Sequence, residues 1–146
     1  MQSASSWNSY RRIATQTAPP GPLILMLFDG AVHSLERALA GFECHDPGEK
    51  NQTIHNNLRR AVDIIRHLNQ CLNLEAGGKL AETLRRLYCY FDDRLTECNL
   101  RKQRDGVDEV MGRLKELRDA WATMLTRLPE TAAEAESGFP AGAARV

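Results

Sequence analysis

The hydrophobic pattern of the chain begins with six consecutive apolar residues at positions 23–28, directly after a segment rich in proline and glycine. Six such residues cover nearly two turns of an α-helix and point in every direction around it, whereas a helix on the outside of a bundle needs only one apolar stripe. The expected core face contains Leu23, Met26, Leu27 and Ala31. Ile24, Leu25 and Phe28 then need cover, either from neighbouring helices or from another polypeptide.

Apolar residues at intervals of three or four predict four helices separated by short loops. Their expected ranges are about 22–42, 51–74, 79–99 and 107–128. Pro47-Gly48, Gly77-Gly78 and Asp105-Gly106 indicate turns between them, and Pro129 is expected to end the fourth helix.

The expected core positions follow one stripe along each helix. They are Leu23, Met26, Leu27, Ala31, Leu35, Ala38 and Phe42 in the first helix; Ile54, Leu58, Ala61, Ile65, Leu68 and Leu72, broadened by Val62 and Ile64, in the second; Leu80, Leu84, Leu87, Phe91 and Leu95, flanked by Ala81, Tyr88 and Cys98, in the third; and Val107, Val110, Met111, Leu114, Leu117, Trp121, Met124, Leu125 and Leu128 in the fourth.

Four long helices with short connections predict an all-α fold, an antiparallel up-down-up-down four-helix bundle formed by residues 18–128. An intermolecular coiled coil is the alternative, but the broad stripes favour closure within one chain. We interpret residues 1–17, which are polar and rich in serine, as a flexible N-terminal arm. Residues 129–146 are rich in alanine, glycine and glutamate and are expected to form a disordered tail.

Composition argues against several classes of partner. The chain has 19 lysines and arginines and 19 aspartates and glutamates, so its formal net charge is zero, and no strong field attracts nucleic acid or a membrane surface. The longest apolar run ends at Asp29, which is too short for a transmembrane helix, and no signal peptide is recognisable. The cysteines lack Cys-x-x-Cys spacing and are expected to be reduced thiols of a cytoplasmic protein: Cys44, Cys71, Cys89 and Cys98.

The sequence offers little support for catalysis or for a cofactor. A di-iron bundle needs repeated Glu-x-x-His pairs, and here only His33 and Glu36 have that spacing, in reversed order. Cys44 adjoins His45, but adjacency in sequence does not make a catalytic pair. No phosphate-binding glycine loop or serine nucleophile motif is present. We therefore predict a binding protein without metal or cofactor, whose interhelical groove receives an amphipathic helix.

Three blocks of the sequence resemble the FliS-type flagellar secretion chaperones. The first is Tyr10, Thr17-Ala18 and residues 23–31. The second comprises residues 61–65, Leu68-Asn69, Leu72, Gly77-Gly78, Leu84, Leu87-Tyr88, Tyr90, Arg94-Leu95 and Asn99. The third spans residues 107–121 and ends in Ala120-Trp121. The resemblance covers residues 10–128.

The resemblance implies a cytoplasmic bundle that binds the C-terminal segment of newly made flagellin in apolar grooves, prevents its polymerisation and docks at the flagellar type III export gate. It implies that the N-terminal arm takes part in gate docking and occupies part of the client groove. The client-binding residues expected on this basis are Tyr10, Ile13, Leu23, Ile24, Leu27, Phe28, Tyr88 and Asn99.

Other interpretations stay open for several residues. Tyr88 and Trp121 would also suit packed aromatic positions whose polar atoms are hydrogen-bonded, and Asn99 would suit a helix terminus. Asp29 is expected to cap the helix or to pair locally. If Ile24 and Phe28 face the groove, aspartate at either position should weaken client binding more than helicity. The alternative function is an adaptor, or a homodimer, that binds another amphipathic helix.

One departure from the family pattern concerns the start of the first helix. Pro19 and Gly21-Pro22 stand where the family has serine and charged or amide residues. The helix therefore lacks a serine N-cap, a contact typically worth ~1 kcal/mol.

Overall fold

The computed structural model describes residues 20–135, with side chains to residue 127, so the predicted arm and the end of the chain from residue 136 lie outside the described residues. Residues 20–135 form four α-helices and no strand: α2 (Gly21–Gly41), α3 (Pro47–Gln70), α4 (Leu74–Arg101) and α5 (Asp105–Ala135).

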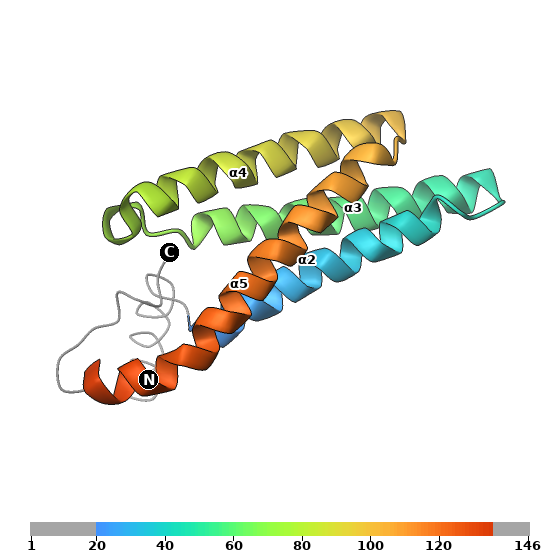
Figure 1. The fold of residues 1–146 in the computed structure, drawn as a ribbon. Helices are drawn as coiled ribbons and strands as arrows, with labels where there is room; N and C mark the ends of the chain where they lie inside the picture. Colours follow the sequence, from blue (N-terminus) through green and yellow to red (C-terminus); the bar gives the residue numbers. More distant parts are fainter. Residues whose placement is uncertain (1–19, 136–146) are drawn as a thin grey trace, which may run out of the picture.

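The helices form an antiparallel bundle in which each helix packs on two others. α2 packs on α3 and α5, and α4 packs on the same two helices. Figure 1 shows α4 and α5 meeting at their connecting loop and diverging toward their opposite ends. The α4–α5 interface is the least extensive of the four. The predicted up-down-up-down bundle is confirmed, and α4 and α5 diverge toward one end of it.

Two of the helices begin with side-chain caps. Asp46 accepts a hydrogen bond of 2.9 Å from the Glu49 N–H at the start of α3, and Asn73 accepts one of 3.0 Å from the Ala76 N–H at the start of α4. Each cap satisfies one of the free N–H groups of a first helical turn. At the start of α2, Pro20 occupies the cap position and makes no side-chain cap bond, in agreement with the departure noted in the sequence.

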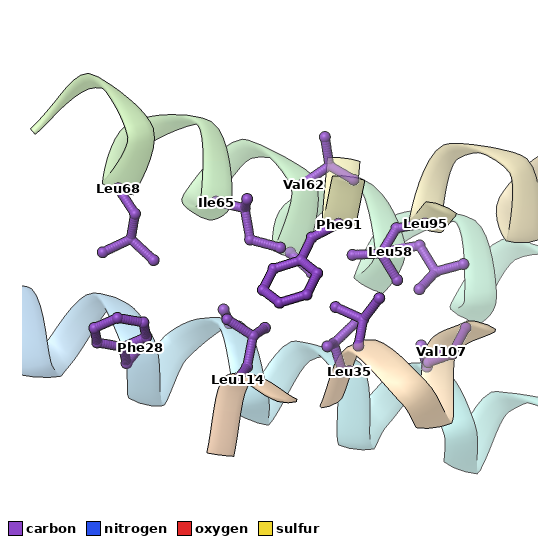
Figure 2. Packing of buried hydrophobic residues seen from close by; sticks show 14 of the residues in the cluster. Phe28, Leu35, Leu58, Val62, Ile65, Leu68, Phe91, Leu95, Val107 and Leu114 are labelled. Atoms are coloured by element: carbon purple, nitrogen blue, oxygen red, sulfur yellow. The ribbon is translucent and has the colours of Figure 1, made fainter. Parts of the chain in front are cut away.

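One continuous apolar core runs between the four helices, and Figure 2 shows Phe91 of α4 between the side chains of α2, α3 and α5. The expected stripe of α3 is confirmed from Ile54 to Leu68. The largest fully buried apolar side chains are Phe91, Leu35, Ile54, Leu58, Ile65, Leu68, Leu95, Leu114, Val107, Val110 and Cys98. Helix propensity alone leaves helices only marginally stable in water, so burial of this apolar core supplies most of the stability of the four helices.

The predicted core face at the start of α2 is wrong for Leu23 and Met26, whereas Ala31 is buried as expected. Ile24 and Phe28 are buried, with 8% and 3% of their surfaces exposed, whereas Leu23 is 43% and Met26 is 67% exposed. An unbroken apolar run does not show which of its residues face the core. The inward-facing side is set by the rest of the helix. The fully buried stripe through residues 31, 35 and 38 continues backward in steps of three and four to positions 28 and 24.

The turn between α3 and α4 also differs from the prediction. α3 ends at Gln70, and the Gly77-Gly78 pair lies inside the first turns of α4, where Gly78 breaks the helical geometry with φ 56° and ψ −133°. Beyond this break Leu80, which was expected in the core, is 60% exposed. Its neighbour Ala81 is fully buried in its place.

The end of α5 differs as well. The helix continues through Pro129 to Ala135, so the segment predicted to be a disordered tail begins with helical residues. A proline inside a helix removes one N–H donor and crowds the carbonyl four residues earlier, which either kinks or ends the helix; here α5 does not end at Pro129.

Candidate binding cleft

An apolar cleft of about 210 Å³ lies at the end of the bundle where α4 begins and diverges from α5. Ile24 and Phe28 are almost fully buried and form its floor, whereas Leu80 and Ala120 are exposed and form its rim. Its lining residues come from all four helices and the α3–α4 turn: Ile24, Phe28, Leu68, Cys71, Leu72, Leu80, Leu84, Tyr88, Leu117, Ala120, Trp121 and Met124.

The chemistry of the cleft is that of a site for apolar side chains. None of its lining residues, all of which belong to the described part of the chain, carries a charge. The polar side-chain groups among them are the Cys71 thiol, the Tyr88 hydroxyl and the Trp121 indole N–H. Burial raises the pKa of the Cys71 thiol, so this group is protonated near neutral pH and behaves as a small apolar surface.

Trp121 connects α5 to the start of α2. Its indole N–H donates a hydrogen bond of 2.9 Å to the carbonyl oxygen of Gly21, and its side chain is 8% exposed. A side chain at position 21 would collide with Leu125 of α5, so glycine permits this close approach. The interpretation of Trp121 as a packed aromatic with a bonded polar atom is confirmed.

Tyr88 is more deeply buried than Trp121, but its hydroxyl lacks the hydrogen bond that the Trp121 indole makes. The residue is 3% exposed and lines the cleft. Among the described residues its hydroxyl has no hydrogen-bond partner. Burial, with a smaller contribution from the nearby Cys71 thiol, raises the pKa of the Tyr88 phenol far above its ordinary value, so the hydroxyl remains a neutral donor and acceptor.

The structure brings together three of the expected client-binding residues: Ile24, Phe28 and Tyr88. Leu23 is exposed on α2 outside the cleft lining, and Leu27 packs partly buried against the core. Because aspartate at Ile24 or Phe28 would disrupt core packing as well as the cleft, these substitutions cannot separate binding from folding. Tyr10 and Ile13 lie outside the described residues.

Asn99 lies away from the cleft, near the C-terminal end of α4. It is eleven residues beyond Tyr88, about 16 Å along the helix axis. Its amide contacts the His55 ring at 3.0 Å, and Lys102 donates bonds of 2.7 Å to its backbone oxygen and its side-chain oxygen. α4 continues to Arg101, and Lys102 has the left-handed conformation that ends it. Asn99 is therefore a helical residue near the end of α4 whose side chain makes polar contacts, and it does not itself terminate the helix.

Asp29 pairs with a distant residue, so the expectation of a local contact is wrong. Its carboxylate accepts a bond of 2.7 Å from Arg118 of α5. The two charges belong to a polar groove between α2 and α5 that is separate from the apolar cleft. The bundle therefore has two separate surface depressions, an apolar cleft and a charged groove between α2 and α5.

Sequence reasoning assigned several cleft residues to the core and did not name them as binding residues. They are Leu68, Leu72, Leu80, Leu84, Leu117 and Met124. These residues continue the core stripes of α3, α4 and α5 toward one end of the bundle. Periodicity marks them as core, but it gives no sign that α4 and α5 diverge there.

The described part of the chain has neither a metal-binding cluster nor a membrane-spanning helix. Between residues 20 and 135 no group of three or more histidine, cysteine, aspartate or glutamate residues is placed to hold a metal ion. Within the same range, no helix combines the length and apolar character needed to cross a membrane.

Comparison with known proteins identifies the family. The model of the family described as "Flagellar protein FliS" matches residues 3–127. The chain belongs to the FliS family. The flagellar secretion chaperone FliS of Salmonella typhimurium (strain LT2) is 36% identical over 126 residues, which cover 83% of this chain and 90% of the relative.

Further FliS relatives extend the match. The flagellar secretion chaperone FliS of Bacillus subtilis (strain 168) is 32% identical over 115 residues, covering 79% of this chain and 82% of the relative. That of Escherichia coli (strain K12) is 31% identical over 130 residues, covering 86% and 93%. The resemblance seen in the three sequence blocks is confirmed. Membership in FliS, a family of export chaperones, also confirms that the protein is not an enzyme.

Proposed function

We propose that this FliS-family chain binds the C-terminal segment of flagellin through the apolar cleft, keeps that segment from polymerising in the cytoplasm and delivers it to the flagellar type III export gate. The observation that supports flagellin binding is the cleft itself, whose lining comes from every helix of the bundle and includes no charged residue. The family match supports the export role.

The shape and size of the cleft suit one face of an amphipathic helix. Such a helix presents anchors at positions i, i+3, i+4 and i+7 to an apolar groove. A volume of about 210 Å³ accommodates a few anchoring side chains and leaves most of the helix outside. Leu23 and Met26, three residues apart near the start of α2, are exposed on a face of the helix that points away from Ile24, and they offer a second apolar surface to a client longer than the cleft.

Binding in an apolar cleft also explains how a chaperone hides a client. Each buried methylene contributes about 0.8 kcal/mol, and ordering a disordered segment costs about 2–5 kcal/mol. The anchors must therefore be largely removed from water before the complex is stable. A client face buried in this way is unavailable for assembly with other flagellin subunits.

Two exposed leucines of α4 provide a matched test. Leu80 is 60% exposed on the rim of the cleft, and Leu100 is 82% exposed near the opposite end of the same helix. Leu80→Asp should weaken binding of a flagellin C-terminal peptide at least about tenfold, because a charge would be desolvated at the rim. Leu100→Asp should leave affinity unchanged. Isothermal titration calorimetry measures both, and circular dichroism checks that each variant is folded.

Two results would contradict this function. A wild-type protein that does not bind the peptide would exclude the proposed client. Equal affinity of the Leu80→Asp and Leu100→Asp variants would show that the peptide binds elsewhere on the bundle.

The exposed residues of α2 favour one alternative, a homodimer formed through this apolar face. Leu23 and Met26 are the side chains that such an interface would bury. Sedimentation of the protein alone distinguishes the two: a stable dimer that Met26→Asp dissociates supports the alternative, and a monomer that forms a one-to-one complex with the peptide supports the chaperone function.

We also propose that the N-terminal arm, with Tyr10 and Ile13, competes with the client for the cleft and contributes to docking at the export gate. This proposal rests on the family resemblance. Removal of residues 1–17 should then raise the affinity of the flagellin peptide. An unchanged affinity would show that the arm does not compete.

A further inference from the structure

The Tyr88 hydroxyl is an unusual group for its place in the fold. Tyr88 is 3% exposed, it lines an otherwise apolar cleft, and no described residue gives its hydroxyl a hydrogen bond. The other buried aromatic polar group of the cleft, the Trp121 indole N–H, is bonded to Gly21. Of these two groups, only the tyrosine hydroxyl is left for a ligand.

A wholly apolar occupant would leave this buried hydroxyl without a hydrogen-bond partner and would exclude water from the cleft that Tyr88 lines. Burying a hydroxyl without a hydrogen-bond partner is unfavourable, because the group loses water and gains nothing. An occupant that supplies a partner avoids this loss. The hydroxyl therefore favours clients that carry a polar group at one position of an apolar face.

The partner group must come from a side chain if the occupant is helical. Backbone N–H and C=O groups inside a helix are already bonded to residues four positions away. It must also be uncharged, because no lining residue offers a countercharge and an unpaired charge in an apolar site is strongly disfavoured. Serine, threonine, asparagine and glutamine meet both conditions.

We propose that Tyr88 is a specificity-determining residue of the cleft, and that it hydrogen-bonds one uncharged polar side chain set within the apolar face of the bound helix. This inference rests on the proposed function and adds a chemical requirement on the client. The floor and rim residues favour a client helix with a large apolar face. Tyr88 favours one that carries a single polar side chain at a particular position of that face.

Tyr88→Phe is the primary test, with Tyr90→Phe as the matched control. Both changes remove one hydroxyl from α4, but Tyr90 is 42% exposed and bonds Glu109 away from the cleft. Tyr88→Phe should weaken binding of the flagellin C-terminal peptide about three- to tenfold. Its urea midpoint should be unchanged or raised, because phenylalanine removes an unpaired buried hydroxyl. Tyr90→Phe should leave the affinity unchanged.

The partner on the client is identified by a double-mutant cycle. Each serine, threonine, asparagine and glutamine of the peptide is replaced by alanine and titrated against the wild type and against Tyr88→Phe. At one position, the alanine substitution should weaken binding to the wild type but have little further effect on the variant.

Several outcomes overturn the inference. One is that Tyr88→Phe binds the peptide as tightly as the wild type or more tightly. Another is a clear fall in its urea midpoint, which would show that the hydroxyl already has a stabilising partner in the free protein. The third is the absence of coupling at every polar peptide position. If Leu80→Asp still weakens binding in any of these cases, the proposed function stands and only the role of Tyr88 is rejected.

Discussion

The indole N–H of Trp121 and the carbonyl oxygen of Gly21 lie 2.9 Å apart and join residues separated by one hundred positions in the chain. The bond holds the first residue of α2 on the second half of α5. It does so at a helix start where Pro20 makes no side-chain cap bond. A tertiary hydrogen bond thus anchors the helix end that provides two residues of the cleft floor, Ile24 and Phe28.

Trp121→Phe tests the contribution of this bond. The variant keeps an aromatic ring but loses the donor and part of the packed volume, so its free energy of unfolding should fall by about 1–3 kcal/mol. Urea denaturation followed by circular dichroism measures the change. If stability is unaltered, the start of α2 is held by packing against Leu125 and its neighbours rather than by the hydrogen bond.

The fold follows from sequence because four apolar stripes with short loops admit few arrangements. The predicted stripe of α3 is correct because polar residues such as Asn56, Arg59 and Asp63 interrupt the apolar ones and define its phase. At Leu23–Phe28 no polar residue interrupts the run, so the first turn alone did not show which side faces inward. Carrying the phase back from Leu35 would have selected Ile24 and Phe28.

The cleft was not predictable in the same way. It exists because α4 and α5 diverge from their shared loop, and crossing angles depend on the whole set of side chains at each interface. Leu80 illustrates the difficulty. It is larger than Ala81, and the apolar pattern predicts it in the core, but the buried stripe of α4 runs back from Tyr88 to Ala81 and leaves Leu80 on the rim.

Gly78 and Gly112 form a matched pair for testing the break at the start of α4. A Cβ atom would meet nothing within 4 Å at either position, but only Gly78 has a positive φ, of 56°. Gly78→Ala should lower the free energy of unfolding by about 1–2 kcal/mol, because its conformation is open only to glycine. Gly112→Ala should raise it by about 0.5–1 kcal/mol, because alanine favours a helix interior.

Thermal or urea unfolding of the two variants gives the comparison directly. Changes of opposite sign for Gly78→Ala and Gly112→Ala would confirm that backbone conformation, rather than space, requires glycine at position 78. Stabilisation by alanine at both positions would show that the break is not a stable feature of the protein.

The Asp29–Arg118 pair should contribute little to stability despite its length of 2.7 Å. The side chains are 52% and 37% exposed, and ion pairs in such surroundings are weakened by solvent and by salt. Asp29→Asn should change the free energy of unfolding by less than about 1 kcal/mol. Peptide affinity should not change, because neither residue lines the cleft. A large loss of affinity would extend the binding surface onto the α2–α5 groove.

Glu109 should make stability depend on acid pH through its contacts with α4. Its carboxylate accepts a bond of 2.6 Å from the Tyr90 hydroxyl and one of 3.1 Å from the Arg94 guanidinium, and these contacts lower the pKa of Glu109 below the ordinary value of 4.5. Because the folded-state pKa is the lower one, the stabilisation is present above the ordinary pKa and is lost as pH falls through the folded-state value.

Glu109→Gln removes this charge and should therefore cost more at neutral pH than in acid. The free energies of unfolding of the wild type and the variant are compared at about pH 7 and about pH 3. The difference between the two proteins should be larger at the higher pH, and added salt should reduce it because the carboxylate is partly exposed. A difference that does not vary with pH would mean that Glu109 acts only through its packing and its neutral hydrogen bonds. The pH dependence therefore measures how far charge holds α5 on α4 next to the loop from which the two helices diverge.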